Sequence, residues 1–409
     1  NVFSDLTIIV MEHQFIKDRD IILFSSQPWN SEIAFNFKDM AFELARYNRV
    51  LFIDRARDRN SILKRIFSPE TRKEKESETP VLIRENLWIL HPGTTMESGN
   101  WSPVYKLFDF FNRINNKRLA TEIKQAIRYL TFDDCLMIND NDFFRGLYQK
   151  SLLPVRDYIF YLRDALTSQR YYRKYGPRCE MEMIQKADLV VANSAWLAEY
   201  AGQWNPNSIN IGQGCNLDSF IKTGLPEPPD MRAIPKPIAG YCGALSSLRL
   251  DEELLIYIAR SLPEISLVLV GPADNRFMES QLRTLPNVYF LGLKPPDQTA
   301  SYIHQFNVCI NPQLLNPLTI GNYPRKIDEY LASGKPVVAT ATAAMEMFRN
   351  FTELCTSKED FVMAIRKLIS QPEKSGDKSL TDGRDFALTH NWENSMGALG
   401  DALYFTEKK

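Results

Sequence analysis

The stretch "GNYPRKIDEYLASGKPVVAT" places three charged side chains at the start of a short predicted helix. They are Arg325, Lys326 and Glu329. Basic side chains at the positive end of a helix dipole favour a bound phosphate. A carboxylate one turn further along does not help to bind phosphate, but it can accept two ribose hydroxyls. The pattern therefore suggests a nucleoside diphosphate, although Arg325 and Glu329 are also spaced as an ordinary i,i+4 ion pair, worth about 0.2–0.5 kcal/mol.

Two loops that precede predicted helices could bring backbone groups to the same phosphate. In "GYCGALSSLRLD", Gly243 ends an apolar run, Arg249 follows in the loop, and Asp251 suits the cap of the next helix. The loop "NPLTIGNY" runs into a helix that flanking proline and glycine residues predict over 324–333. The first loop is not a G-x-G-x-x-G fingerprint, which disfavours an NAD-dependent dehydrogenase. By itself it is also compatible with an ordinary turn between a strand and a helix.

Apolar runs that suit buried strands alternate with helical patterns in both halves of the chain. In the first half, the predicted strands are 20–25, 49–54, 87–90, 134–139, 157–162, 188–193 and 208–212. In the second half they are 237–244, 266–271, 287–292, 307–312 and 335–340, and helices are predicted over 251–262, 297–305, 324–333, 358–370 and from about 391. The fold class is therefore α/β, with two Rossmann-like doubly wound domains that face a cleft.

The segment 222–237 separates the two halves, because its five prolines exclude the interior of a helix or strand. It predicts a hinge between two rigid bodies. Ligands of doubly wound folds bind at the carboxyl ends of the strands, so the cleft between the halves is the expected site.

Length, charge and composition limit the classes of function. A chain of 409 residues suggests two domains, and a net charge of −1 gives no field that would select nucleic acid. The six cysteines form no C-x-x-C pair and the four histidines show no metal-ligand spacing, so we expect reduced thiols, no metal and no cofactor. No apolar run approaches the roughly 18 residues that span a bilayer, and no signal peptide is recognised, which predicts a cytoplasmic protein.

Several of these stretches together resemble a known family. The stretches "GYCGAL", "LVLVGP", "LPNVYFLGLKP", "NVCINP" and "YPRKIDEYLASGKPVVAT" are similar to the C-terminal half of retaining glycosyltransferases of family 4, which have the GT-B fold. The stretches "KADLVVANSAWLAEYA", "INIGQGCNLDSF" and "THNWENS" resemble the segment before that family's hinge and its terminal helix. The resemblance covers 188–405 well and 20–187 loosely. It is closest to bacterial enzymes of surface polysaccharide synthesis, such as the teichuronic-acid type.

The resemblance implies a domain organisation and a reaction. The implied parts are an N-terminal acceptor-binding Rossmann-like domain (1–216), a Pro-rich hinge (217–237), a C-terminal nucleotide-sugar-binding Rossmann-like domain (238–390) and a last helix that crosses back (391–409). The implied reaction moves a sugar, with retention and without a metal, from a nucleoside-diphosphate sugar to a glycan or lipid-linked saccharide acceptor. The leaving diphosphate would be stabilised by the helix N-terminus and by basic side chains.

The same resemblance assigns roles to residues of the second half. Glu329 matches the second glutamate of the family's E-x7-E motif and would hold the ribose. Lys326 and Arg249 would meet the diphosphate and act in catalysis, while Leu293 would meet the base through its main chain. The binding site would be completed by backbone at Gly243, Thr319, Ile320, Gly321 and Asn322.

Two positions depart from the family pattern. The first glutamate of E-x7-E falls on Gly321, so the carboxylate that commonly contacts the donor sugar is missing. Arg249 matches the family's basic position only approximately. These departures leave open a catalytically silent nucleotide-sugar-binding subunit. A nucleotide-sugar epimerase on the same fold is a further alternative, with His91 as its one obvious candidate group.

The first half is expected to bind the acceptor on loops that leave its strands. Trp29 could stack on a sugar, and Gln27 and Asn30 could bond hydroxyl groups, with an ordinary surface turn as the alternative. Arg163 and Asp164 follow a later strand near the expected reacting centre. Asp164 could serve as a base, a cap or an ion-pair partner.

The run 55–75 carries eight Lys or Arg residues against three Asp or Glu residues. Such a run could make peripheral contact with anionic lipid at the cytoplasmic face of the inner membrane. The alternative is a solvated loop.

Overall fold

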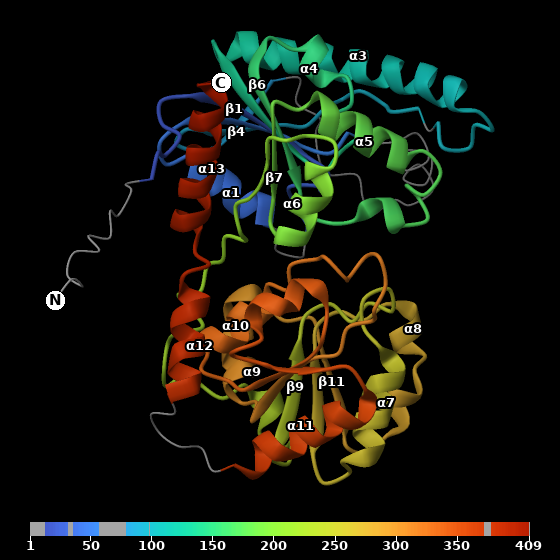
Figure 1. Cartoon of the computed structure of the whole chain (residues 1–409), viewed down its shortest axis with the longest axis vertical. Coiled ribbons are helices and arrows are strands. Elements are labelled where there is room, and N and C mark those ends of the chain that lie inside the picture. The colour runs from blue at the N-terminus through green and yellow to red at the C-terminus, as the bar shows by residue number, and fades with distance from the viewer. Residues whose placement is uncertain (1–12, 32–35, 57–78, 98, 372–377, 409) are drawn as a thin grey trace, which may run out of the picture.

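The computed structural model describes residues 13–31, 36–56, 79–97, 99–371 and 378–408, and these form two lobes stacked along the long axis of the molecule (Figure 1). Each lobe is a sheet covered by helices. Most of the basic run 55–75 lies outside the described residues, so membrane contact through it stays a prediction.

The N-terminal lobe is built on an eight-stranded sheet. Its strands are β1 (Asp20–Ser25), β2 (Arg49–Ile53), β3 (Val81–Arg84), β4 (Leu87–Leu90), β5 (Cys135–Asp140), β6 (Val155–Leu162), β7 (Leu189–Ala192) and β8 (Ser208–Asn210). Their order is β3-β4-β2-β1-β5-β6-β7-β8, and only the edge pair β3–β4 is antiparallel. From β4 to β7 this is the order 3-2-1-4-5-6 of a doubly wound fold.

The C-terminal lobe repeats that order in a six-stranded parallel sheet, β11-β10-β9-β12-β13-β14. Its strands are β9 (Ile238–Cys242), β10 (Ser266–Val270), β11 (Val288–Gly292), β12 (Val308–Asn311), β13 (Val337–Thr340) and β14 (Glu353–Cys355). The predicted α/β class with two Rossmann-like domains is confirmed.

Helices cover both faces of each sheet. Those of the N-terminal lobe are α1 (Asn36–Leu44), α3 (Tyr105–Tyr129), α4 (Gln149–Leu152), α5 (Gly176–Lys186) and α6 (Ala195–Gly202). The later ones are α7 (Glu252–Ser261), α8 (Asn275–Met278), α9 (Thr299–His304), α10 (Lys326–Ala332), α11 (Lys358–Ser370), α12 (Lys378–Leu388) and α13 (Trp392–Glu407). Figure 1 shows α12 beside the lower lobe and α13 beside the upper one.

The two faces of each sheet have separate apolar cores. In β1, Ile21 and Leu23 belong to one core while Ile22 and Phe24 belong to the other, because side chains alternate along a strand. All four are buried, as expected for a parallel strand covered on both faces. Leu399 of α13 shares the core of Ile21, so the last helix closes one face of the N-terminal sheet.

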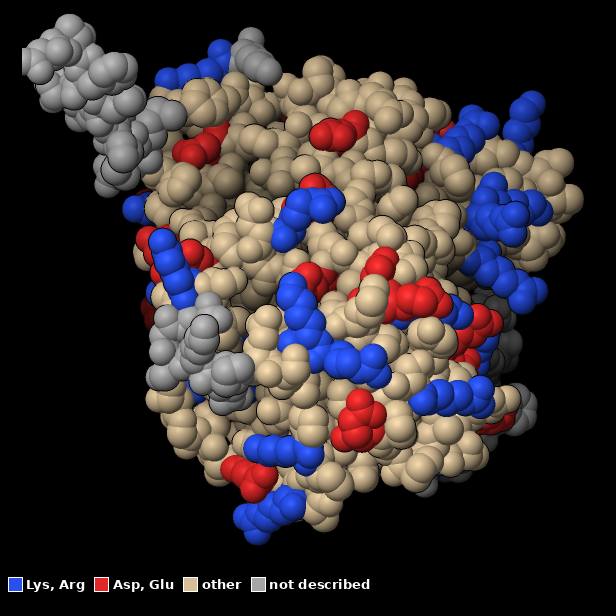
Figure 2. Space-filling model, turned by 60° about the horizontal axis from the view of Figure 1, so that its bottom comes forward, with Lys and Arg blue, Asp and Glu red and all other residues tan. Residues whose placement is uncertain are grey.

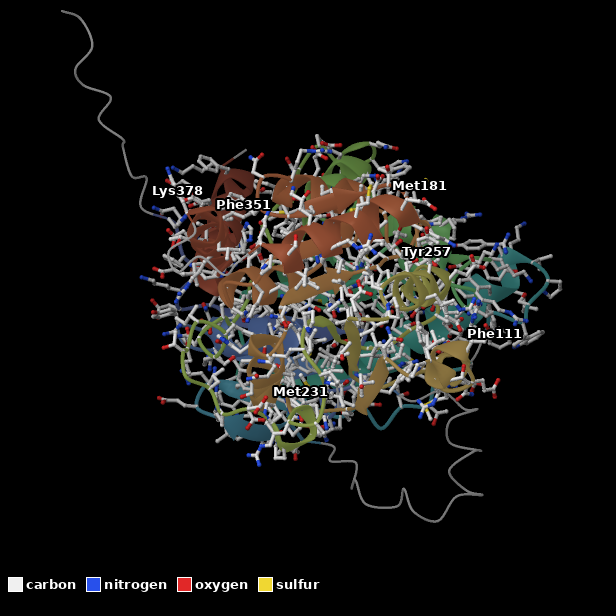
Figure 3. The ribbon with its side chains drawn as sticks, turned by 90° about the horizontal axis from the view of Figure 1, so that it is seen from below. Phe111, Met181, Met231, Tyr257, Phe351 and Lys378 are labelled. Carbon is white, nitrogen blue, oxygen red and sulfur yellow. The ribbon has the colours of Figure 1, made fainter. Side chains whose placement is uncertain are left out.

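The Pro-rich segment is fixed to the C-terminal lobe. Asp230 accepts hydrogen bonds from Lys294 Nζ at 2.7 Å and from the Tyr302 hydroxyl at 2.9 Å. Met231, which is labelled in the view from below (Figure 3), is buried in that lobe's core. The chain therefore crosses between the lobes before this segment, and returns where Cys215 pairs with Asn391.

The surface carries charges of both signs. On the face shown in Figure 2, basic and acidic side chains are interspersed over apolar and neutral surface, in keeping with a net charge of −1. All six cysteines are buried and free. In the part of the chain that the structure describes, no helix is both long enough and apolar enough to cross a bilayer.

Candidate functional site

Three glycines line the carboxyl edge of the C-terminal sheet, where the sequence predicts a phosphate. Gly243, Gly271 and Gly292 follow or end neighbouring strands, and all three have positive φ. Gly243 N–H donates to the Val270 carbonyl at 2.8 Å, and Gly271 N–H donates to the Gly292 carbonyl at 2.9 Å. A Cβ atom at Gly271 would lie 2.0 Å from the Gly243 carbonyl oxygen, so the edge is built from closely packed backbone.

Lys326 lies directly over this edge. Its Cε would be 3.1 Å from a Cβ atom on Gly243, and its Nζ lies 5.2 Å from the centre of the Tyr241 ring. Among the described residues Lys326 has no hydrogen-bond or ion-pair partner. The structure thus brings together Gly243 and Lys326, as the sequence predicts.

Arg249 and Asp164 form an ion pair across the lobes, with Nη2 3.0 Å from Oδ1. The amide of Asn322, turned so that its oxygen faces Arg249, accepts from Nη1 at 2.5 Å and donates to Asp164 Oδ1 at 3.0 Å. Of the roles considered for Asp164, the structure shows the ion pair. Arg249 is therefore already paired with a carboxylate of the N-terminal lobe. A bound diphosphate would have to displace Asp164 from it.

Behind this pair lies a second, fully buried one. Arg163 contacts both oxygens of Asp140, at 2.5 and 3.0 Å, and Ser26 donates to the same carboxylate at 3.3 Å. Asp140 is 0% exposed, and its burial raises its pKa against the opposing effect of Arg163. Arg163 was expected to bind the acceptor. Its guanidinium instead fixes the end of β5, and its main chain leads to Asp164.

Helix α10, which carries Lys326 and Glu329, begins later than predicted. It spans Lys326–Ala332, with Arg325 as an N-cap that makes no side-chain capping bond. The first turn is closed by tight local bonds, such as Ile327 N–H to the Pro324 carbonyl at 2.8 Å. Gly334 ends the helix at a φ of 66°, as predicted.

Glu329 is reached by the arginine that precedes it. Arg325 Nε lies 3.3 Å from Glu329 Oε1, and Arg325 Nη1 lies 3.4 Å from Asp39 Oδ2 on α1 of the other lobe. Burial raises the pKa of both carboxyls, and Arg325 opposes that rise in each. The i,i+4 pair therefore exists, and the ribose role of Glu329 stays a prediction.

The missing family glutamate has a structural explanation. A Cβ atom on Gly321 would lie 2.0 Å from the indole of Trp196, and the Ser194 hydroxyl donates to the Gly321 carbonyl at 2.7 Å. Both contacts come from the start of α6 in the N-terminal lobe. A side chain at position 321 is therefore incompatible with this approach of the lobes.

The loop around Gly321 corrects one prediction. Thr319 and Ile320 N–H both donate to the Asn316 carbonyl at 3.0 Å, and Asn322 N–H donates to the Thr319 carbonyl at 3.3 Å. Three of the four predicted phosphate donors are therefore used inside the loop. The prediction that they bind diphosphate is wrong for this conformation. Leu293, in contrast, is 52% exposed just after Gly292, where its main chain can be reached.

Trp29 corrects a second prediction. It is 6% exposed and packs edge-on against Phe42 and Phe52, so it cannot stack on a sugar. Gln27 lies nearby, and its buried amide oxygen has no hydrogen-bond partner among the residues that the structure describes, while Asn30 is exposed. Trp29, which was expected to bind a sugar, therefore anchors this loop to the core instead.

A cavity of about 800 Å³ opens between the lobes beside the Arg249–Asp164 pair. Its walls come from the loop after β6, from α5 and α6, and from C-terminal loops at Leu248 and 316–318. Sequence reasoning missed this cavity. It did not single out Trp196, although Trp196 lies in the quoted stretch that follows the strand predicted over 188–193, and Glu180 belongs to no quoted motif. Among the described residues, no group of three His, Cys, Asp or Glu side chains gathers as a metal site.

Comparison with known proteins identifies the C-terminal lobe. Residues 236–371 match the family described as glycosyl transferases group 1. The teichuronic acid biosynthesis glycosyltransferase TuaH of Bacillus subtilis (strain 168) is 26% identical over 245 residues, which are 56% of this chain and 60% of that protein. The match thus spans less than two thirds of the relative.

Solved structures match both lobes. Sucrose-phosphate synthase from Thermosynechococcus elongatus superposes with a TM-score of 0.69 at 17% identity, covering 95% of this chain and 99% of that one. An Anabaena protein in complex with UDP and glucose gives a TM-score of 0.62 at 18% identity, covering 96% and 98%. The chain therefore has the two-lobed GT-B fold, and residues 236–371 of its C-terminal lobe match the glycosyl transferases group 1 family.

Proposed function

We propose that this protein is a glycosyltransferase that moves a sugar from a nucleoside-diphosphate sugar to a glycan or lipid-linked saccharide acceptor of bacterial surface polysaccharide. The observation that carries the proposal is the position of Lys326, a cation without an ion-pair partner among the described residues, over the glycine edge of a group 1 lobe. The Anabaena structure in complex with UDP and glucose supports a nucleotide sugar as donor.

The diphosphate would lie against Gly243, under Lys326. As the bond from the anomeric carbon to the diphosphate oxygen breaks, its electron pair leaves with the nucleoside diphosphate. Lys326 then faces the charge that develops, which is the main catalytic task in such a reaction. Glu329 would hold the ribose and the exposed main chain at Leu293 the base. Arg249 would exchange Asp164 for the diphosphate.

Retention of configuration is the stereochemical course that we propose. The two carboxylates at the centre of the site are already engaged, Asp140 with Arg163 and Asp164 with Arg249. Neither is placed as a free nucleophile, so with retention the acceptor hydroxyl would attack on the face that the diphosphate leaves, and the departing diphosphate oxygen would take the hydroxyl proton. Lys326 and Arg249 supply the charge that a divalent ion would otherwise provide, so the reaction is proposed to be metal-independent.

The protein is proposed to act in the cytoplasm, with peripheral contact at the membrane face as an option for a lipid-linked acceptor. The relationship to TuaH supports a role in polysaccharide synthesis.

Incubation with a panel of UDP-, GDP- and dTDP-sugars in excess EDTA tests the proposal. We expect one donor to release free nucleotide, faster with an acceptor saccharide, and the rate to be unchanged by EDTA. Activity lost with EDTA and restored by Mg²⁺ or Mn²⁺ would contradict the metal-independent mechanism. Isomerised nucleotide sugar would indicate an epimerase, with His91, whose Nδ1 lies 2.8 Å from Asp54, as its candidate group. Binding without turnover would indicate the silent subunit.

A further inference from the structure

The large cavity between the lobes contains a buried carboxyl group that the proposed donor site does not use. Glu180 of α5 lies in the cavity wall and is 1% exposed. Its Oε1 accepts a hydrogen bond from the Tyr200 hydroxyl at 2.8 Å, and its Oε2 has no hydrogen-bond partner among the described residues. Burial raises the pKa of Glu180 to about 7. A buried acceptor left unpaired is costly, so this oxygen calls for a donor from a ligand.

Two parallel, stacked aromatic rings lie beside that carboxyl. The rings of Trp196 and Tyr200, one turn apart on α6, are 4° from parallel with centroids 6.1 Å apart, and both line the cavity. Aromatic faces carry partial negative charge, which attracts the weakly positive C–H groups on one face of a sugar ring. An aromatic face next to a lone hydrogen-bond acceptor suits a ligand that is apolar on one side and rich in hydroxyls at its edge.

The position of the cavity ties it to the reaction. Ala165 and Leu248, which line it, are the chain neighbours of Asp164 and Arg249. Those two side chains form the ion pair at the centre of the cleft. A ligand in the cavity would therefore lie next to the place where the donor sugar is expected.

We propose that this cavity binds one pyranose unit of the acceptor glycan, with its C–H face on Trp196 and Tyr200 and one hydroxyl or amide N–H donating to Glu180 Oε2. The proposal rests on the proposed glycosyltransferase function and names its acceptor-side subsite. An alkyl chain would fill the apolar part of the cavity, but it would leave Oε2 unpaired. Glu180 is a specificity-determining residue in this account, since it rejects a ligand without a donor at that place.

The rim of the cavity adds a preference for charge. Arg170 and Arg173 line it and have no ion-pair partner in the described parts of the chain. A pyranose with an anionic substituent, either a uronate or a phosphate, would place that group near them. Among otherwise equal sugars, the anionic one is therefore expected to bind more tightly.

Binding of simple glycosides tests the subsite directly. The probes are methyl β-D-glucuronide, methyl N-acetyl-β-D-glucosaminide and methyl α-D-glucopyranoside-6-phosphate, with tetradecyl phosphate as the alkyl probe and UDP as the donor-side control. We expect at least one glycoside to bind the wild-type protein, and Glu180→Gln to weaken it about 10-fold or more. Glu199→Gln, the same change at an exposed position of α6, should leave glycoside binding unchanged. UDP affinity should be equal in all three proteins.

The outcomes separate this proposal from the function on which it rests. Glycosides that fail to bind while UDP binds would overturn the subsite and leave the function intact. Failure of UDP and of every other nucleoside diphosphate would count against the function, whatever the glycosides do. Tetradecyl phosphate that binds equally to wild type and Glu180→Gln, with no glycoside bound, would show an alkyl site instead. If Glu180→Gln does not fold, Trp196→Leu supplies the second arm, and unchanged glycoside binding in it would overturn the proposal.

Discussion

Arg325, Lys326 and Glu329 are adjacent in one short helix and yet have different surroundings. Arg325 is shared between Glu329 and Asp39, so it connects the two lobes. Lys326 faces the glycine edge with no ion-pair partner among the described residues. Two neighbouring cations thus have different partners, because consecutive positions at the start of a helix point about 100° apart, one side chain toward the other lobe and the next toward the strand ends.

Substitution of Gly321 by alanine adds one methyl group and so tests the close contact between Gly321 and the indole of Trp196. Gly321→Ala should destabilise the protein by about 1–3 kcal/mol, because its Cβ meets the indole of Trp196 and the packed interface must shift. Gly202→Ala is the matched control, since nothing lies within 4 Å of a Cβ atom there. Denaturant unfolding of both variants decides it. Equal midpoints would contradict the described contact, and Gly321→Ala should cost less in a Trp196→Ala background than in the wild type, because the indole that the methyl group meets is then absent.

Glu180 predicts a pH dependence of stability. Its pKa is raised by burial from 4.5 to about 7, so the folded protein holds the proton more tightly than the unfolded chain. That contribution is fully present below pH 4.5 and is lost as the pH rises to about 7. Relative to Glu180→Gln, the wild type should therefore lose stability between pH 5 and pH 8, by up to about 3 kcal/mol. If the difference in melting temperature between the wild type and Glu180→Gln is constant over that range, the pKa of Glu180 is not raised in the folded protein.

The elements were predictable where pattern and burial agree. Strands such as β1 and β9 were found within one or two residues, since continuous apolar runs identify parallel strands buried on both faces. Helix α3 was not predicted, although it is 25 residues long. Part of its buried face is polar, because Asn112, Asn115 and Asn116 point into hydrogen-bonded positions. These polar side chains interrupt the regular spacing of apolar residues by which an amphipathic helix is recognised in a sequence.

The sequence predicts the parts of the site that lie at one edge of one sheet. It does not predict the parts that form where the two lobes meet. Gly243 and Lys326 come together because strand ends and helix starts meet at one edge of a parallel sheet. The cover of Gly321 by Trp196 joins segments that are remote in sequence. The prediction for Trp29 was wrong for a related reason. A tryptophan in a predicted loop suggests a surface for stacking on a sugar, but its burial depends on tertiary neighbours that the local sequence does not show.

Helix α7 begins at a cap that the sequence indicated. Asp251 accepts from Leu254 N–H at 2.9 Å, so Asp251→Ala should lower the free energy of unfolding by about 1 kcal/mol. Asp251→Asn is the matched control, because it keeps an acceptor oxygen and should lose only a few tenths of that. Urea unfolding measures both. A loss of the same size in the two variants would show that charge, rather than the capping bond, sets the effect.

At the scale of the whole molecule, the lobes are held by a few polar contacts and two chain crossings. The Ser194–Gly321 bond and the Arg249–Asp164 pair lie on the cleft, while Cys215 N–H donates to the His390 carbonyl at 2.9 Å where the crossings meet. Contacts of this kind are individually weak, so the lobes are expected to separate when the cleft contacts are removed.

Small-angle scattering tests that expectation. A double variant, Ser194→Ala with Asp164→Asn, should have a larger radius of gyration than the wild type, because both cleft contacts are lost. Asp134→Asn, which breaks an exposed pair with Arg156 within the N-terminal lobe, is the control and should leave the profile unchanged. Identical profiles for all three proteins would mean that the crossings and the remaining contacts between the lobes, such as Arg325–Asp39, hold them in place.

The central claim is that the glycine edge under Lys326 binds the diphosphate of a nucleotide sugar. Isothermal titration of Lys326→Ala with UDP, GDP and dTDP, and with the matching nucleosides, tests it most directly. Charged hydrogen bonds contribute roughly 1.5–3 kcal/mol, so the diphosphate that binds wild type should bind the variant about 10- to 100-fold more weakly, with its nucleoside little affected. Lys367→Ala, which removes an exposed cation on α11, should bind both as the wild type does. If Lys326→Ala binds every diphosphate as tightly as the wild type, the nucleotide lies elsewhere and the account is wrong.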